Sequence, residues 1–303
     1  MKKIITIFYF VLLTTLAYTN NAYAKETNEA SNYERVLDES KLLPLAEGGD
    51  KKAQNSLGFL YTNGLGVTQD YVKAFKWYRK AAEQGFAFAQ TSLGTMYHNG
   101  LGVLKDYAEA IKWYRKAAEQ GNAQAQHNLG LIYKKGHGIT QDYVKAFEWY
   151  QKAAEQDLAP AQNNLGFMYE KGHGITQDYV KAFEWYQKAA EQGLATAQNN
   201  LGVMFNQGSG TKQDYAKALR WFEKSAKKGN TTAQYNLGVM YHFGQGVPKD
   251  YVQAYAWLST AARGEYNYTQ ITPDSVASVM TPDEISKGRR LADIFWDKYG
   301  NKE

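Results

Sequence analysis

The sequence of 303 residues contains no cysteine. Its stability therefore does not depend on disulfide bonds, although an oxidising compartment would permit them. The chain also lacks a strong excess of charge of one sign, since 35 Lys and Arg stand against 30 Asp and Glu. This balance gives no electrostatic reason to expect a nucleic acid or an anionic membrane surface as the partner.

Long hydrophobic runs are absent except at the start of the chain. Two lysines precede an apolar run over 4–17, and Ala22-Tyr23-Ala24 forms a small-x-small motif. The run is short for a membrane span, so we interpret residues 1–24 as a signal peptide cleaved after Ala24. Its removal leaves 33 Lys and Arg against 30 Asp and Glu, a net charge of +3. We expect a periplasmic or secreted protein without an integral membrane segment, and no lipoprotein because no cysteine follows the cut.

The chain after the polar residues 25–34, which we interpret as a flexible leader, is built on a repeat of 36 residues. The repeat places one tryptophan column at Trp77, Trp113, Trp149, Trp185, Trp221 and Trp257. A glycine column has the same spacing, at Gly58, Gly94, Gly130, Gly166, Gly202 and Gly238. Counted from Ala53, the six copies cover 53–88, 89–124, 125–160, 161–196, 197–232 and 233–268. A period of this length predicts an all-α solenoid.

Two helices are predicted in each copy, over 53–63 and 71–84 in the first. Asp70 is well placed to cap the second helix, and glycines at 64 and 85 allow the positive φ with which helices end. The recurring aspartates are therefore interpreted as helix caps and not as a carboxylate ladder for calcium. Gly58 lies within the first helix, where glycine destabilises by roughly 1 kcal/mol. We infer that a neighbouring helix approaches closely there.

The pattern A-x-x-x-L-G-x-x-Y-x-x-G-x-G-V, followed by D-Y-x-x-A-x-x-W-Y-x-K-A-A-x-x-G, resembles the Sel-one-like repeat family, a relative of tetratricopeptide repeats. The resemblance covers residues 53–268. It implies helix-turn-helix units stacked into a right-handed superhelix that binds other proteins. Three positions depart from the pattern: Asp157 and Glu265 replace a terminal glycine, and Ser225 replaces an alanine. These departures put only the local turn geometry in doubt.

The two ends are predicted to close the array. Residues 35–52 match the second half of a repeat but carry Lys41 in the tryptophan column, which suits a solvent-facing N-terminal cap. In the last repeat, the face that is charged elsewhere becomes apolar or small, so we expect residues 269–303 to cover it as a C-terminal helical cap. Thr281-Pro-Asp-Glu284 reads as a capping box that begins a helix, and a shorter helix is expected over 274–279.

No catalytic, cofactor-binding or metal-binding residues are predicted. His137 and His173 share a loop column, where neighbours lie about 10 Å apart, too far to share a metal, and we expect them to face solvent. Ser209-x-x-Lys212 and Ser225-x-x-Lys228 match a spacing found in penicillin-recognising enzymes, yet no Lys-Thr-Gly or Ser-Asp-Asn accompanies them. A hydrolase acting on β-lactams or peptidoglycan remains the alternative class, because cysteine-rich relatives have been linked to β-lactams.

The first helix of each copy has an apolar stripe, which in the first copy is Ala53, Leu57, Leu60 and Tyr61. When successive residues are placed 100° apart, the third, seventh and tenth positions counted from Ala53 point away from this stripe, and these three columns vary between copies. The third column reads Asn55, Thr91, His127, Asn163, Asn199 and Tyr235. The seventh reads Phe59, Thr95, Leu131, Phe167, Val203 and Val239. The tenth reads Thr62, His98, Lys134, Glu170, Asn206 and His242. Copies three and four are identical over residues 135–156 and 171–192, so their agreement carries little information.

A largely apolar row between two polar rows predicts a groove for an extended peptide or a partner helix. The competing interpretation is that these residues pack against an adjoining helix. The sequence thus favours a monomeric, non-enzymatic protein-interaction scaffold of the bacterial envelope or secreted fraction, with a secreted host-interaction factor as a further possibility. We expect a protein or peptide partner and no cofactor.

Overall fold

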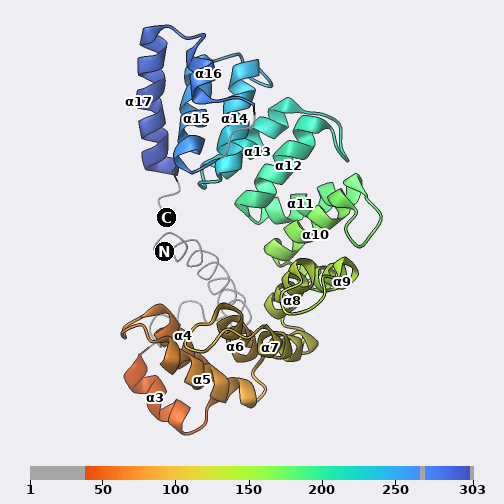
Figure 1. The fold of residues 1–303 in the computed structure, drawn as a ribbon, viewed down its shortest axis with the longest axis vertical. Coiled ribbons are helices and arrows are strands. Elements are labelled where there is room, and N and C mark those ends of the chain that lie inside the picture. Colours follow the sequence, from red (N-terminus) through yellow and green to blue (C-terminus); the bar gives the residue numbers. More distant parts are fainter. Residues whose placement is uncertain (1–37, 267–269, 301–303) are drawn as a thin grey trace. The chain divides into compact units, whose positions relative to one another are not determined.

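The computed structural model describes residues 38–266 and 270–300, and the predicted signal peptide and leader lie outside them. All regular elements in these residues are helices. The described chain divides into two compact units at Leu158, and along each unit consecutive helices pack side by side (Figure 1). These features confirm the predicted all-α solenoid, whereas the right-handed superhelix stays a prediction. None of the described helices is both long and apolar enough to cross a membrane.

The first unit holds the N-terminal helix α3 and three helix pairs. The first helices of these pairs are α4 (Lys51–Asn63), α6 (Ala87–Asn99) and α8 (Ala123–Lys135). The second helices are α5 (Tyr71–Glu83), α7 (Tyr107–Glu119) and α9 (Tyr143–Ala154). Helix α3 (Glu39–Glu47) covers α4 with Leu42 and Ala46, while Lys41 is exposed.

The second unit holds three further pairs and two terminal helices. Its first helices are α10 (Ala159–Lys171), α12 (Ala195–Gln207) and α14 (Thr231–Phe243). Its second helices are α11 (Tyr179–Glu191), α13 (Tyr215–Ala226) and α15 (Tyr251–Arg263). They are followed by α16 (Pro273–Ala277) and α17 (Pro282–Tyr299).

The helix ends follow from local chemistry. Each second helix begins after an aspartate whose carboxylate accepts backbone N–H groups of the first turn, as Asp70 does from Lys73 at 2.9 Å. Helix α4 begins two residues before the predicted Ala53, because Asp50 caps it by accepting from the Ala53 N–H at 2.7 Å. It ends at Gly64, which has a φ of 66°. The predicted aspartate caps and glycine ends are confirmed.

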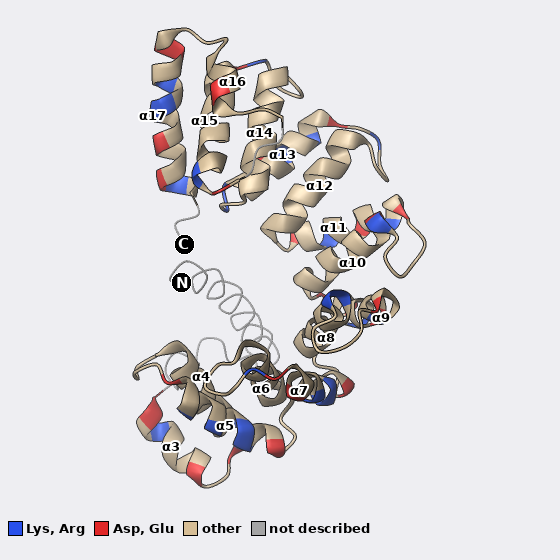
Figure 2. Ribbon diagram, in the orientation of Figure 1, with Lys and Arg blue, Asp and Glu red and all other residues tan. Residues whose placement is uncertain are grey.

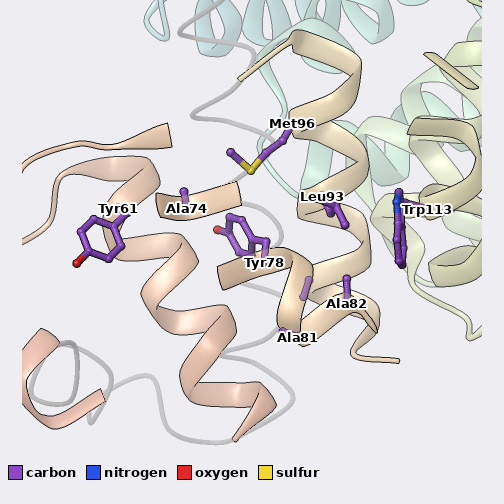
Figure 3. Packing of buried hydrophobic residues seen from close by; sticks show 9 residues of the cluster. Tyr61, Ala74, Tyr78, Ala81, Ala82, Leu93, Met96 and Trp113 are labelled. Atoms are coloured by element: carbon purple, nitrogen blue, oxygen red, sulfur yellow. The ribbon is translucent and has the colours of Figure 1, made fainter. Parts of the chain in front are cut away.

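The mid-helix glycine column marks the closest approach inside each repeat. A Cβ atom on Gly58 would lie 2.6 Å from the ring of Tyr78 on α5. Tyr78 is 2% exposed and lies among Ala74, Leu93 and Met96 (Figure 3). The predicted close approach is confirmed, and what approaches is the side chain of the paired second helix. The remaining five glycines of the column meet Tyr114, Tyr150, Tyr186, Phe222 and Leu258 in the same way.

The last repeat is covered by the C-terminal helix. Thr281 and Glu284 form the predicted capping box at the start of α17. Helix α17 packs along α15, where the ring of Phe295 stacks on Trp257 with centroids 4.1 Å apart. Trp257 is consequently 5% exposed. This cover explains why α15 lacks the charged face of the other second helices.

Candidate functional site

The third column of the first helices is largely buried. Asn55, Thr91, His127, Asn199 and Tyr235 are buried, and Asn163 is half-buried. Two of its amides bond to the following repeat: Asn163 Oδ1 accepts from Asn200 Nδ2, and Asn199 Oδ1 accepts from Asn236 Nδ2, both at 3.0 Å. This column therefore contributes to packing between neighbouring first helices as well as bordering the predicted groove.

The seventh column is half-buried in every repeat. Phe59 and Val239 each rest partly against a core cluster of their own unit. Thr95 accepts a hydrogen bond from the Tyr114 hydroxyl at 3.0 Å. In the first unit the column consists of Phe59, Thr95 and Leu131, and in the second unit of Phe167, Val203 and Val239. Phe59, Thr95 and Val239 thus contact the repeat, and every side chain of the column keeps part of its surface exposed.

The tenth column is half-buried except at Thr62, which is buried and donates to the Gly58 carbonyl at 2.7 Å. Glu170 accepts from the Tyr186 hydroxyl at 2.7 Å. Burial lowers the pKa of Lys134, and repulsion from Lys135 acts in the same direction. His98, Asn206 and His242 complete the column, and each has a buried nitrogen or oxygen without a hydrogen-bond partner. The tenth column is therefore the most varied in chemistry.

The loop histidines do not simply face solvent, so that expectation is corrected: His137 and His173 are half-buried. The His137 ring stacks on Tyr107 with centroids 5.1 Å apart and lies 5.6 Å from the ring of His98. The loop that carries His137 lies directly against the start of α7, since a Cβ atom on Gly138 would lie 2.5 Å from Tyr107 Cβ. Sequence reasoning missed this cluster because it joins three different columns.

The surroundings of this cluster disfavour the protonated, positively charged form of its two histidines. Burial lowers the pKa of His98 to about 4, and the charges of His137, Lys105 and Lys135 add to the shift. Burial, with Lys135 and Lys105, also lowers the pKa of His137. No group of three or more His, Cys, Asp or Glu side chains suited to a metal occurs in 38–266 or 270–300.

Four second helices place a tyrosine hydroxyl beneath the first helix of the same repeat, and sequence reasoning assigned these hydroxyls no role. Tyr78 bonds to the Thr62 and Ser92 side chains, and burial raises its pKa to about 12. Tyr114 donates to Thr95 and Tyr186 to Glu170. The Tyr150 hydroxyl is buried without a partner. The signal available in the sequence was a tyrosine column that changes to Phe222 and Leu258 in the last two repeats.

In the second Ser-x-x-Lys match, the serine and the lysine bond to different groups. Ser225 is fully buried and donates to the Ala195 carbonyl at 2.6 Å. Lys228 donates to the Gly193 carbonyl at 2.5 Å. Ser209 lies in the turn after α12. The hydroxyl of Ser225 and the ammonium of Lys228 are therefore engaged with different backbone groups.

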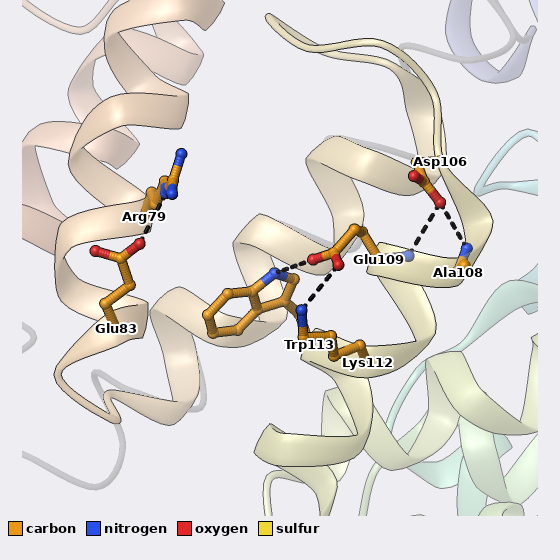
Figure 4. A network of polar contacts seen from close by, with 7 residues as sticks. All are labelled: Arg79, Glu83, Asp106, Ala108, Glu109, Lys112 and Trp113. Carbon is orange, nitrogen blue, oxygen red and sulfur yellow. Dashed lines mark hydrogen bonds and ion pairs between the residues drawn. The ribbon is translucent and has the colours of Figure 1, made fainter.

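The exposed face of the second helices pairs its charges internally. In Figure 4, Glu109 accepts from the Trp113 indole N–H at 3.1 Å and from Lys112 at 2.8 Å. A lysine lies 4.0–4.6 Å from the centroid of the tryptophan ring three residues before it in five repeats. Acidic and basic residues are interspersed along both units (Figure 2). The three columns of the first helices vary more between repeats than this charged face does.

Comparison with known proteins agrees with this architecture. The pattern described as the Sel1 repeat matches residues 51–86, 87–122, 123–158, 159–194, 195–230 and 231–266. Its first residue coincides with the start of α4, two residues before the boundary chosen from the sequence. No curated protein sequence matches the chain significantly.

Two solved structures are similar over most of the chain. A Sel1 repeat protein from Oxalobacter formigenes shares 35% identity with a TM-score of 0.68, covering 82% of this chain and 99% of that protein. A protective antigen present in uropathogenic Escherichia coli strains, which displays an SLR fold, shares 32% identity with a TM-score of 0.59. That similarity covers 86% of this chain but only 64% of the antigen.

Sel1 repeat proteins are generally protein-interaction scaffolds, and the family is typically non-catalytic. The six consecutive matches cover most of the described residues and coincide with the helix pairs. The chain belongs to the Sel1 repeat family.

Proposed function

We propose that this protein is a non-enzymatic scaffold that binds an extended peptide or a partner helix along the third, seventh and tenth columns of its first helices. The observation that carries the proposal is the half-buried seventh column, which is present in all six repeats and apolar in five of them. Apolar surface rimmed by polar groups is typical of a recognition groove. Contact with a partner would bury the exposed part of these side chains.

The polar columns on either side give the groove its selectivity. Amides, hydroxyls, histidines and one acidic and one basic side chain vary along the first helices, while the packing columns stay constant. Two of these amides, Asn163 and Asn206, are half-buried and so stay within reach of the backbone groups of an extended peptide, while its alternate side chains reach the apolar row. Each unit offers three successive first helices for this contact.

We also propose that the protein acts outside the cytoplasm, in the envelope or the secreted fraction. The predicted signal peptide over 1–24 supports this location. The similarity to a protective antigen adds support, because an antigen that protects is accessible on or outside the cell. Cleavage after Ala24 is tested by N-terminal sequencing of the protein recovered from periplasm and culture medium.

The binding proposal is tested by Phe167→Asp. The matched control is Val180→Asp, which places the same charge on the second helix of the same repeat, where Val180 is 56% exposed. Each purified variant is used to capture partners from the native envelope fraction, and each is melted alone. We expect Phe167→Asp to lose the captured partner, with a loss of stability of only about 1–2 kcal/mol because Phe167 is half-buried. Val180→Asp should retain the partner.

Two results would contradict the proposal. Equal capture by both variants would show that the seventh column does not meet the partner. A large loss of stability in Phe167→Asp alone would assign this residue to the core.

A further inference from the structure

One hydrogen bond inside the repeat is replaced in the second and sixth repeats. In the other four, a glutamine in the loop before the second helix donates from Nε2 to the backbone carbonyl of the tenth-column residue at 2.6–2.8 Å; these glutamines are Gln69, Gln141, Gln177 and Gln213. The second and sixth repeats have Lys105 and Lys249 at this position. A lysine here therefore takes the place of a hydrogen bond that holds the loop to the end of the first helix.

A histidine of the tenth column accompanies the lysine in both repeats. His98 precedes Lys105 by seven residues, and His242 precedes Lys249 by seven. Lys105 Nζ lies 4.8 Å from the centroid of the Tyr107 ring, which in turn lies 5.1 Å from that of His98. The replacement of the glutamine thus places an ammonium group near an imidazole.

The second repeat differs from the sixth because another repeat follows it in the same unit. The third repeat adds His137, whose ring lies 5.6 Å from that of His98, and the exposed Lys135. Lys105 is exposed as well, and both histidines are half-buried, so all four side chains are open to solvent in part. The charges of Lys105 and Lys135 act on both imidazoles, and no acidic side chain of the described residues offsets them.

This cluster lacks the internal pairing that is found nearby. Several exposed cations of the first unit have an acidic partner in the same helix, as Lys112 has in Glu109 at 2.8 Å. Neither Lys105 nor Lys135 forms an ion pair within the part of the chain that the structure describes. Asp106 follows Lys105 directly, but its carboxylate accepts from two N–H groups at the start of α7. A carboxylate that neutralises the cluster would come from another molecule.

We infer that the cluster of His98, Lys105, Lys135 and His137 binds an acidic side chain of the partner protein at the edge of the proposed groove. The inference rests on the proposed scaffold function and names the chemistry of one contact within it, since His98 belongs to the tenth column. The two exposed ammonium groups meet the carboxylate first, and no buried group has to open. A single aspartate or glutamate suits the site better than a long polyanion, because the acidic residues at the start of α7 would repel further negative charge.

The test titrates the whole protein with a capped tetraglutamate peptide and, for comparison, a capped tetraglutamine peptide, using NMR shifts of residues 98–107 and 135–138. Lys105→Gln is the informative variant, because four repeats have glutamine at this position. It should weaken tetraglutamate binding by about threefold to fivefold, the effect of one surface ion pair. Lys135→Gln should have a similar effect. Lys76→Gln is the matched control, since it removes the same charge from the exposed face of α5, and it should bind as the unmodified protein does.

Thermal melting separates binding from a structural role. Lys105→Gln should leave the melting temperature unchanged or raise it, because the loop hydrogen bond of the other repeats is restored. A lower melting temperature would instead assign Lys105 to the stability of the loop and contradict the inference.

The pH dependence tests the histidines. A bound carboxylate raises the pKa of both imidazoles from the lowered values that burial and the lysines cause, so binding takes up protons. Tetraglutamate should therefore bind roughly twofold to fivefold tighter at pH 6 than at pH 7.5. The double variant His98→Asn/His137→Gln, which uses residues found in these columns at 206 and 245, should bind equally at both pH values.

Three further results would overturn the inference: equal binding of the two peptides, equal loss of binding in Lys76→Gln, or tighter binding of a single-stranded oligothymidylate of equal charge than of tetraglutamate. If a natural partner is captured and lost in Phe167→Asp but unaffected by Lys105→Gln combined with Lys135→Gln, the scaffold function holds and the acidic contact is wrong. If no partner is captured, the scaffold function fails, and the peptide titration still decides the acidic site.

Discussion

Residues 38–158 and 159–300 build the same helix pairs with different interiors. In the first unit every second helix carries a buried tyrosine, and His127 is buried as well. In the second unit the tyrosine column continues at Tyr186 and then changes to Phe222 and Leu258. Among the described residues, 159–300 contain no fully buried histidine.

The difference teaches that one backbone geometry accepts interiors of different polarity. The mid-helix glycine receives a tyrosine, phenylalanine or leucine side chain at a closest distance of 2.6–2.8 Å from its built Cβ position in all six repeats. What changes is whether the side chain that packs under the first helix carries a hydroxyl group, as tyrosine does, or none, as in phenylalanine and leucine. We therefore expect the first unit to respond to pH and to groove ligands, and the second unit to depend on its apolar cap.

The largest expected effect is at that cap. Phe295→Ala removes the ring that stacks on Trp257 at 4.1 Å and should destabilise the second unit by about 3 kcal/mol. Lys224→Ala is the control, because Lys224 lies 4.0 Å from the ring centroid of Trp221 in a solvated pair and should contribute less than about 1 kcal/mol. Urea unfolding followed by hydrogen exchange of α15 measures both. Similar losses would show that α17 is not a stabilising cover.

The next effect is acid sensitivity of the first unit. The pKa of His98 and that of His127 are lowered by burial to about 4, against an unfolded value near 6.5. Between pH 4 and 6.5 the unfolded chain binds more protons than the folded protein does. The stability that the two neutral imidazoles contribute is therefore complete above pH 6.5 and is lost as the pH falls toward 4. At pH 5 the loss for the fully buried His127 is of order 2 kcal/mol, and less for the half-buried His98.

Hydrogen exchange of α8 and α12 between pH 7 and 5, corrected for intrinsic rates, measures this effect. Protection should fall more in α8 than in α12. His127→Asn is the control, since asparagine is the residue found in this column at 163 and 199. Its response to pH should be smaller, and an unchanged response would rule out His127 as the source.

A smaller effect is expected when a glycine of the mid-helix column is replaced by alanine, and its size should differ between the two units. Gly94→Ala places a Cβ atom 2.7 Å from Tyr114, whose hydroxyl is fixed on Thr95. Overpacking should destabilise by about 1–3 kcal/mol despite the better helix propensity of alanine. Gly238→Ala meets the side chain of Leu258 at 2.6 Å, and we expect a smaller loss because leucine has more freedom to shift. Denaturant unfolding of both variants checks the order, and the reverse order would show that the fixed hydroxyl is unimportant.

The smallest expected effect is a gain of stability. Asp157 and Glu265 have φ values of 60° and 62° at positions where the other repeats have glycine. Replacing either by glycine should relieve strain and stabilise its unit by up to about 1 kcal/mol. Glu265→Gly should gain more, because aspartate tolerates this conformation better than glutamate does. Thermal melting compares the two, and a loss of stability would show that the side chain makes a contact worth more than the strain.

Much of this architecture could be predicted because the same local sequence signals occur in all six repeats. The aspartate column, the glycines at helix ends and the capping box at Thr281 and Glu284 all act within a few residues of the chain. The close approach at Gly58 was predicted from its position inside a helix, although the approaching group, Tyr78, was not. The candidate groove was located only by columns, and its binding role stays a proposal.

Contacts between columns could not be predicted in the same way. His137 meets Tyr107 and His98 because a loop of one repeat rests on the second helix of the preceding one. The surroundings of the Tyr150 hydroxyl differ from those of Tyr114 and Tyr186, because the third repeat has Leu131 where the second has Thr95, and Lys134 where the fourth has Glu170.

The sequence by itself determined the number of repeats, the two helices of each repeat with their aspartate caps, and the family, because these depend on periodicity and on chemistry along a short stretch of chain. Only the tertiary structure decided which polar atoms have partners. Side chains 16 to 39 residues apart come together when helices pack, and whether a buried hydroxyl or imidazole finds an acceptor depends on ångström-scale distances that spacing along the chain does not specify.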